Sequence, residues 1–336
     1  MSSVKFKLNL VPQKSNILIN YSDSLFLVGS CFTENMGAKF KHHLFSVYEN
    51  SHGILFNPIS VCNALEDCIQ LKQYHAKELF LLNELWHSWQ HHSRFSDITP
   101  EGALEKINDA IATAHLHLKS AKHIVITLGS AWLYEITKEA PSGEGMVVAN
   151  NHKAPANWFF KKLINPDALI EKLNSLVHKL KIFNPDLHII FTISPVRHLR
   201  EGLVDNNRSK AVLIQAVHEL VGKHNQLSYF PAYEYVIDDL RDYRFYAEDL
   251  VHPNYTATQY VWEKFIETYM PNLTQQAMKQ VAEIQLAKQH KPFFAGSIEH
   301  QKFLNSMIQK TEQLQLDCPF LDLASILASF KASILK

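Results

Sequence analysis

Short, predominantly apolar runs alternate along the chain with stretches of helical period. The runs are Leu25–Gly29, His123–Leu128 and residues 187–193. They are too short for typical helices and carry few polar side chains, which is typical of strands buried on both faces of a sheet. Helical stretches separate these runs, and this order predicts an α/β domain with a mainly parallel sheet.

Apolar periodicity indicates where the helices lie. In residues 209–224, Leu213, Val217 and Leu220 recur on one face, as in an amphipathic helix packed against a sheet. Similar patterns predict further helices over residues 34–44, 101–120, 166–181 and 255–269.

Three other segments fall outside this alternation. Residues 1–11 alternate apolar and polar side chains and predict a strand, and residues 78–96 predict an antiparallel hairpin inserted into the α/β frame. Beyond residue 270 the chain is rich in Gln, Lys, Ala and Leu, with a helical pattern. We therefore expect an α/β domain over residues 1–270 and a helical C-terminal extension over residues 271–336. The helices of the extension are expected over residues 273–290, 298–314 and 323–335.

The charge balance argues against polyanionic partners. Lys plus Arg total 33 and Asp plus Glu total 33, so the formal charge is 33 − 33 = 0 with neutral histidine. A chain without net positive charge has no overall field to attract phosphate groups, and no long run of Lys and Arg supplies a local one. We therefore expect neither nucleic acid nor a membrane surface as a partner.

The chain has the features of a soluble protein of a reducing compartment. No stretch approaches the roughly 20 apolar residues that span a bilayer, and residues 1–11 lack the unbroken apolar core of a secretory signal. We expect a cytoplasmic protein. Its cysteines are too irregularly spaced for a disulfide scaffold or a zinc site of the Cys-x-x-Cys type. They are Cys31, Cys62, Cys68 and Cys318.

One group of histidines raises the question of a metal. His87, His91 and His92 could coordinate zinc if they lay on a helix. The tryptophans at positions 86 and 89 favour a strand instead, on which alternate side chains diverge. We therefore expect no metal site here, and no cofactor elsewhere.

The turn at residues 29–33, with the sequence Gly-Ser-Cys-Phe-Thr, is the first candidate site. It joins a buried strand to a helix, where unpaired N–H groups at the helix start lower the pKa of a nucleophile and stabilise an oxyanion. In the alternative interpretation, Gly29 permits the turn, Ser30 caps the helix and Cys31 is a small core residue.

Asp249 and His252 form the second candidate site. A carboxylate three residues before a histidine on a short turn can orient the imidazole and stabilise its protonated form, as in the base half of a catalytic triad. In the alternative interpretation, Asp249 is merely solvated and His252 precedes a helix that begins at Pro253.

Taken together, these segments resemble a known group of enzymes. Residues 27–33 resemble the first block of the SGNH (GDSL-like) hydrolases, in which a strand runs into Gly-Asp-Ser, and residues 249–253 resemble their last block, Asp-x-x-His-Pro. Residues 29–32 and 53–58 more closely resemble the GSCFA family, which is grouped with those hydrolases. The likeness covers roughly residues 5–270, and Thr33 stands where the family name has Ala.

The resemblance implies a flavodoxin-like, three-layer α/β/α hydrolase with a triad mechanism. It places Cys31 at the nucleophilic position, with Ser30 as the rival, and it assigns Asp249 and His252 to the orienting carboxylate and the base. A thiol is suited to this role because thiolate is intrinsically nucleophilic.

The resemblance also implies an oxyanion hole, with the Gly53 N–H as one donor beside that of the nucleophile. In the third block, residues 125–132, Ala131 occupies the position of a donor Asn, so either Ser130 or Asn57 replaces it or the enzyme is weaker. Arg197 and His198 follow the strand at residues 187–193, a position that suits substrate binding. Arg197 suits an anionic substrate group, with a surface ion pair as its alternative. The predicted oxyanion and substrate-binding residues are Gly53, Asn57, Gly129, Ser130 and Arg197.

We therefore expect an ester hydrolase that acts on a small acyl ester, with an acetylated carbohydrate as the substrate class that the resemblance favours. Asp242, Tyr243 and Arg244 are expected at the rim of its site, although an aromatic residue there could equally serve packing. An acyltransferase that uses the same residues is the first alternative. A binding protein that has lost the chemistry is the second, and the alanine at position 131 is what supports it.

Overall fold

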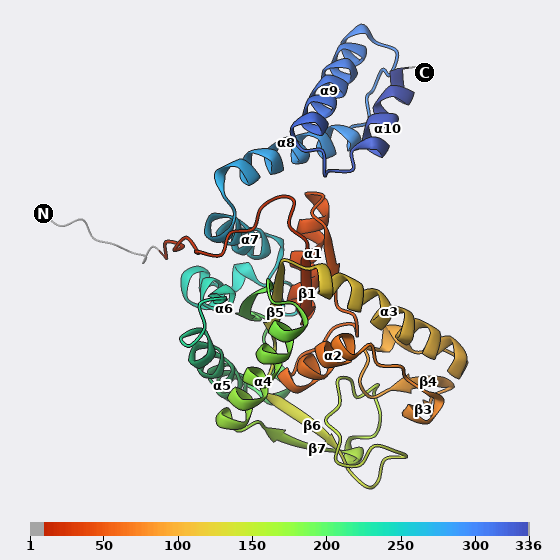
Figure 1. The fold of residues 1–336 in the computed structure, drawn as a ribbon, viewed down its shortest axis with the longest axis vertical. Coiled ribbons are helices and arrows are strands. Elements are labelled where there is room, and N and C mark those ends of the chain that lie inside the picture. The colour runs from red at the N-terminus through yellow and green to blue at the C-terminus, as the bar shows by residue number, and fades with distance from the viewer. Residues whose placement is uncertain (1–9, 335–336) are drawn as a thin grey trace, which may run out of the picture.

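The computed structural model describes residues 10–334, and its centre is a five-stranded parallel sheet (Figure 1). The strand order is β2-β1-β5-β8-β9, and every pairing is parallel. Renumbered within this sheet alone, the order is 2-1-3-4-5, which is the flavodoxin-like arrangement. The predicted α/β fold is confirmed. The strands are β1 (Leu25–Gly29), β2 (Val47–Glu49), β5 (His123–Leu128), β8 (His188–Ile193) and β9 (Leu227–Phe230).

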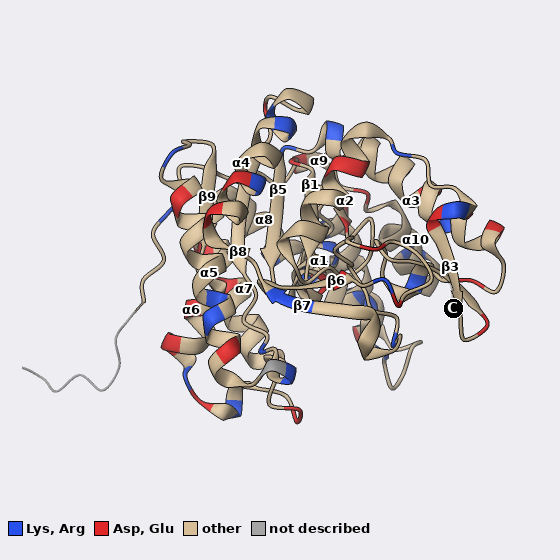
Figure 2. Ribbon diagram, turned by 90° about the horizontal axis from the view of Figure 1, so that it is seen from below, with Lys and Arg blue, Asp and Glu red and all other residues tan. Residues whose placement is uncertain are grey.

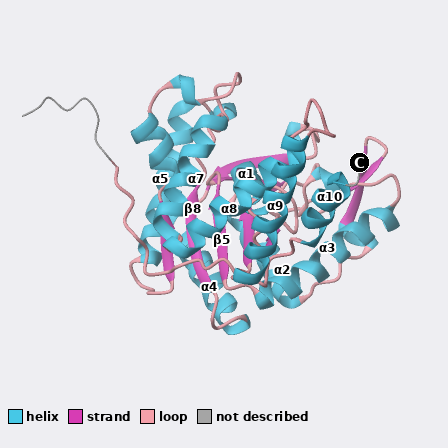
Figure 3. Ribbon diagram, turned by 90° about the horizontal axis from the view of Figure 1, so that it is seen from above, coloured by secondary structure: helices cyan, strands magenta, loops and turns pink. Residues whose placement is uncertain are grey.

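Helices cover both faces of the sheet, which gives three layers (Figure 3). Side chains of β1 point alternately to the two sides, so that Leu25 and Leu27 belong to one apolar cluster and Phe26 and Val28 to the other. The first cluster includes α1 (Cys31–His42) and α7 (Tyr255–Tyr269). The second includes α2 (Pro58–Gln70), α3 (Pro100–Ser120), α4 (Pro166–Phe183) and α5 (Leu203–Val221).

Three of these helices begin with the same local signal. Asn57, Thr99 and Asn165 are N-caps whose side-chain oxygens accept from backbone N–H groups of the first turn, and each is followed by a proline at the first helical position. Proline fits there because its missing N–H is one that the helix could not pair.

Two antiparallel strand pairs are inserted into this frame. β3 (Leu79–Leu82) and β4 (Leu85–Ser88) form a hairpin within the segment where the sequence predicts one. β6 (Trp132–Ile136) and β7 (Phe159–Leu163) form a second pair, which we did not predict. The short remaining elements are α6 (Ala232–Glu234), a π turn over Tyr235–Leu240, and 3-10 turns over Ala76–Glu78, Ser93–Phe95, Ala156–Trp158, Leu199–Glu201 and Tyr243–Phe245.

The C-terminal region is helical, as predicted, with α8 (Asn272–Gln289), α9 (Ile298–Asp317) and α10 (Ala324–Ile334). These helices project from the end of the α/β layers near α1 and α7 (Figure 1). Apolar side chains of all three helices continue the cluster that contains α1 and α7.

The remaining expectations concern the N-terminal strand, membrane-spanning helices and the distribution of charge. Most of the strand expected over residues 1–11 lies outside the described residues. Over residues 10–334, no helix has the length and apolar character needed to cross a membrane. Acidic and basic residues are intermingled along the helices (Figure 2).

Candidate active site

The candidate site lies at the carboxyl edge of the parallel sheet, where β1 ends at Gly29. Its φ is +139°, and a Cβ there would lie 2.1 Å from the Thr127 carbonyl oxygen of β5. Only glycine allows this conformation and this close approach of the two strands. The turn that follows therefore starts directly beside β5.

Ser30 and Cys31 have different surroundings in this turn. Ser30 is fully buried and is the N-cap of α1, because its Oγ accepts from the Phe32 N–H at 3.3 Å. Cys31 is half-buried and is the first residue of the helix. The exposure of the two side chains favours Cys31 as the group that a substrate can reach.

The Cys31 thiol responds to opposing influences. Burial raises its pKa, and Glu34 adds to that effect, whereas the N–H groups of Phe32 and Cys31 and the ammonium of Lys210 act in the opposite direction. Because the net shift is upward, the sulfur is mainly a thiol at neutral pH and needs a base before it can react.

Asp249 and His252 form a hydrogen-bonded pair on the loop before α7. The distance from His252 Nδ1 to Asp249 Oδ2 is 2.6 Å, and Asp249 Oδ1 accepts from the His252 backbone N–H at 3.0 Å. These bonds lower the pKa of Asp249 to about 2. The carboxylate is therefore an acceptor only, so Nδ1 carries the hydrogen and Nε2 is left to accept a proton.

The loop that carries this pair adjoins the end of β8. The Arg197 N–H donates to the Val251 carbonyl at 3.2 Å, and its guanidinium donates to the Leu250 carbonyl at 3.3 Å. The guanidinium also lies 3.9 Å from the ring centre of Tyr246. Arg197, which we predicted to bind substrate, is thus occupied in holding the loop of Asp249 in place.

One of the three expected rim residues, Tyr243, lies near the same arginine. The guanidinium of Arg197 lies 5.0 Å from the ring centre of Tyr243. Asp242 and Arg244 form an exposed ion pair at 3.1 Å. They therefore engage each other rather than present free charges.

The two predicted halves of the site lie at the same end of the molecule. Cys31 and Val251 pack against one apolar cluster, although in the described residues no hydrogen bond joins His252 to either Ser30 or Cys31. The charge of Lys210 acts to lower the pKa of Cys31, and the charges of Lys210 and His252 act to lower that of His198. Catalytic hydrogen bonds are often loose before substrate binds, so this arrangement is compatible with a joint role.

Lys210 of α5 is a functional candidate that sequence reasoning missed. It is 1% exposed, and its Nζ donates to the carbonyls of Gly129 at 2.6 Å and Ser194 at 2.7 Å, which follow β5 and β8. Burial lowers its pKa to about 7. A signal was present, because Lys210 precedes Leu213 by three positions and so falls on the apolar face of the helix.

His198, which the sequence places beside Arg197 after the strand at residues 187–193, is the second candidate. Its Nε2 is buried without a hydrogen-bond partner among the described residues. The nitrogen lies 3.4 Å from where a Cβ on Gly129 would be, and the ring meets that of Phe56 edge-on at 5.5 Å. Burial lowers its pKa to about 3, and the charges of Lys210 and His252 act in the same direction.

Two of the predicted oxyanion donors are used elsewhere. The Gly53 N–H donates to the Asn50 carbonyl at 2.8 Å. Asn57 is the N-cap of α2: its Oδ1 accepts from the Ser60 N–H, and its Nδ2 donates to the Val148 carbonyl at 3.1 Å. The Gly53 N–H is therefore paired within its own turn, whereas Asn57 Nδ2 pairs one of its two N–H groups.

Hydrogen-bonding groups of the third block, residues 125–132, also have partners in and around their own turn. The N–H groups of Gly129 and Ser130 both donate to the Phe56 carbonyl, at 2.9 and 2.8 Å. Ser130 Oγ accepts from the Trp132 N–H and contacts Ser209 Oγ. Ser130 Oγ is therefore engaged with this turn and with Ser209 of α5. Of the backbone donors we expected, the Cys31 N–H at the start of α1 is the one that remains a candidate.

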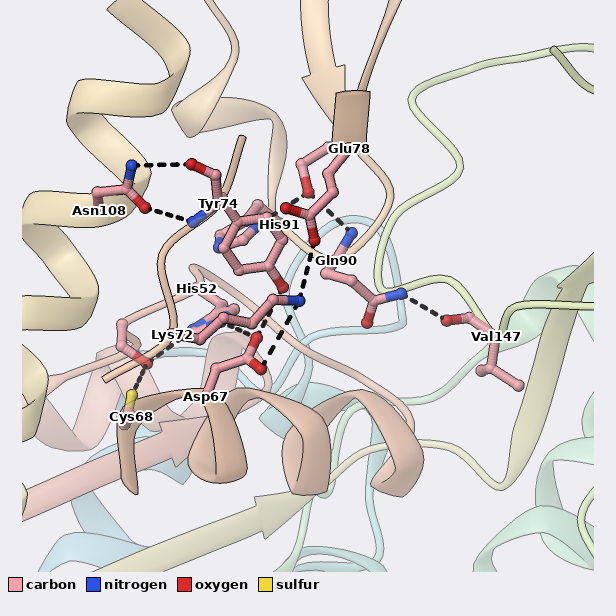
Figure 4. Close-up of polar contacts among 12 residues, drawn as sticks. His52, Asp67, Cys68, Lys72, Tyr74, Glu78, Gln90, His91, Asn108 and Val147 are labelled. Atoms are coloured by element: carbon pink, nitrogen blue, oxygen red, sulfur yellow. Dashed lines mark hydrogen bonds and ion pairs between the residues drawn. The ribbon is translucent and has the colours of Figure 1, made fainter. Parts of the chain in front are cut away.

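A buried polar network fixes the loop that contains Gly53 (Figure 4). Asp67 Oδ2 accepts from the Tyr74 hydroxyl at 2.6 Å and lies 3.3 Å from His52 Nε2. The His52 ring stacks on His91, with 4.3 Å between centroids. His52 is 1% exposed, so this network supports the loop rather than contacts a substrate.

The three histidines weighed for zinc have separate partners. His87 Nδ1 contacts Ser96, His91 Nδ1 contacts Ser88, and His92 accepts from the Arg94 N–H. Over residues 10–334, no group of three or more His, Cys, Asp or Glu side chains is placed to hold a metal ion.

Comparison with known proteins identifies the family. Among solved structures, an acetyl xylan esterase from the rumen bacterium Butyrivibrio proteoclasticus is similar at 10% identity and a TM-score of 0.37. The match covers 74% of this chain and 64% of the esterase, less than two thirds of its length, and it is too distant to assign an activity. No curated protein matches the chain in sequence. Residues 281–336 match the model of the GSCFA domain protein, C-terminal domain. Residues 24–265, well over half of the sequence, match the model of the GSCFA family, and the chain therefore belongs to this family.

Proposed function

We propose that the protein hydrolyses small acyl esters through a cysteine nucleophile. The observation that carries this proposal is the hydrogen bond of 2.6 Å between Asp249 and His252, at the sheet edge where Cys31 begins α1. A carboxylate-oriented imidazole beside a reachable thiol is the arrangement that activates a nucleophile for acyl transfer. The resemblance of residues 27–33 and 249–253 to SGNH hydrolase blocks supports the same chemistry.

The residues divide the reaction into two steps. His252 Nε2 takes the proton of the Cys31 thiol while the sulfur attacks the acyl carbonyl, and the same proton then passes to the departing alcohol as a thioester forms. A water molecule, deprotonated by His252, attacks the thioester, which releases the acid and restores the thiol. Asp249 holds the ring in the required tautomer throughout.

The substrate class rests on the resemblance. A small acyl group, such as an acetyl ester on a carbohydrate, fits this proposal. An alcohol in place of water in the second step would make the same residues an acyltransferase.

Single substitutions test the proposal with p-nitrophenyl acetate, with and without added acceptor alcohols. Cys31→Ala should abolish turnover, and His252→Asn should lower kcat by about 100-fold or more. Cys318→Ala removes another half-buried cysteine and is the matched control. Ser30→Ala should retain activity while losing about 1 kcal/mol of stability with its helix cap.

Two outcomes would change the assignment. Full activity in Cys31→Ala would remove the cysteine mechanism, and loss of activity in Ser30→Ala alone would make Ser30 the nucleophile. Product that partitions to an acetylated alcohol rather than to acetate would identify a transferase.

A further inference from the structure

His198 presents a buried hydrogen-bonding nitrogen that nothing in the described chain uses. Leaving such an atom unpaired costs about 1–3 kcal/mol, so it calls for an explanation. The backbone N–H of His198 donates to Asn206 Oδ1 at 3.0 Å, which anchors the residue to α5. Its ring packs edge-on against Phe56, and its Nε2 faces Gly129. The orientation of the nitrogen is thus built into the turns that follow β5 and β8.

The surroundings keep this imidazole neutral. The residue is half-buried with its Nε2 buried, and the charges of Lys210 and His252 both oppose a further positive charge. A neutral imidazole still carries one N–H and can donate one hydrogen bond. Such a donor can stabilise a developing oxyanion without giving up its own proton.

The proposed reaction lacks a side-chain donor of this kind. Ala131 cannot provide one, and the Gly53 N–H is paired within its own turn. Ser130 Oγ contacts the Trp132 N–H and Ser209 Oγ, and Asn57 Nδ2 already donates to the Val148 carbonyl. A Cβ at Gly129 would lie 3.4 Å from His198 Nε2 and 3.0 Å from the Phe56 carbonyl oxygen, so the imidazole nitrogen lies directly beside this turn.

We propose that the Nε2–H of His198 donates a hydrogen bond to the acyl oxygen as the tetrahedral intermediate forms, in the place of the missing asparagine. This inference rests on the proposed function. It makes His198 a catalytic residue of the acylation step, and it leaves His252 as the base.

The test separates attack on a carbonyl from the reactivity of the thiol itself. Acylation of Cys31 by p-nitrophenyl acetate passes through an oxyanion, whereas thiol exchange with methyl methanethiosulfonate does not. Both single-turnover rates are followed by intact mass spectrometry, with peptide mapping to assign the modified cysteine. The variants are His198→Phe, which keeps a planar ring without a donor, and His198→Gln, whose amide N–H replaces Nε2.

His43→Phe is the matched control. His43 follows α1 at its far end, its Nδ1 is likewise buried without a partner in the described chain, and burial lowers its pKa to about 4. The same substitution is therefore made at a buried neutral histidine remote from Cys31.

His198→Phe should slow acylation about 100-fold while the thiol-exchange rate changes less than about threefold, and His198→Gln should recover most of the acylation rate. His43→Phe should leave both rates unchanged. Equal acylation rates in wild type and His198→Phe would overturn the role of His198 while leaving the proposed function intact. A wild-type Cys31 that exchanges with the thiosulfonate but is never acylated would overturn both.

Discussion

Replacing Lys210 with methionine removes a buried ammonium while keeping a side chain of similar length. The wild-type lysine has a pKa of about 7 in the folded protein because it is buried, compared with an ordinary value of 10.5. At 1.36 kcal/mol per pKa unit, this difference means that the buried, protonated lysine destabilises the folded protein by about 5 kcal/mol at low pH. An uncharged amine retains two N–H groups, so it can still donate to both the Gly129 and Ser194 carbonyls.

The sign of the effect follows from where the proton is bound. Between pH 7 and 10.5 the unfolded chain holds the Lys210 proton and the folded chain has largely lost it, so the free energy of unfolding rises with pH. The wild-type protein should therefore gain about 2 kcal/mol relative to Lys210→Met between pH 7 and pH 9.

Urea unfolding at pH 7, 8 and 9 measures this difference directly. Lys288→Met, at an exposed position of α8, is the matched control and should show no such change with pH. A difference between wild type and Lys210→Met that stays constant from pH 7 to pH 9 would refute the assignment of Lys210 as a buried titrating group.

Three further predictions concern the strand junction, the buried network and the thiol. Gly29→Ala should lose about 2 kcal/mol or more in urea unfolding, because φ is +139° and the new Cβ meets Thr127, and a loss below about 0.5 kcal/mol would contradict this. Burial raises the pKa of Asp67, but its bonds to His52 and Tyr74 lower the pKa by more. Acid below about pH 4 should therefore destabilise wild type more than Asp67→Asn, as followed by circular dichroism. Parallel acid unfolding curves of the two proteins would argue against the network. Because burial raises the pKa of Cys31, iodoacetamide should modify it more slowly at pH 7.5 than it modifies free cysteine, and a faster reaction would indicate a preformed thiolate.

The central strands were predictable because burial on both faces leaves a distinct apolar run. β1 and β5 have this property over their whole length. The edge strands do not: β2 has three half-buried residues, and β9 has only two fully buried ones. Short edge strands carry too little periodic signal to be distinguished from loops.

The site was predictable where its contacts are local. Asp249 and His252 are three residues apart, so their hydrogen bond depends only on the turn between them. The commitments of Gly53 and Asn57 depend on the path of a loop and on the distant Val148 carbonyl, which residue identities do not reveal.

Lys210 was missed, and His198 was given no role of its own, for a related reason. Lysine on an apolar helix face and histidine after a strand are each ordinary in a sequence. Their significance comes from the tertiary turns after β5 and β8, which place the carbonyl of Gly129 beside the ammonium and its Cα beside the imidazole.

The junction near residue 270 joins parts that share one apolar interior. Met278, Val281 and Ile284 of α8 lie in the same cluster as Trp262 and Phe265 of α7. A chain that ended at this junction would lose the apolar side chains that α8 contributes to the cluster, and we expect it to be less stable and more prone to aggregate than the full chain.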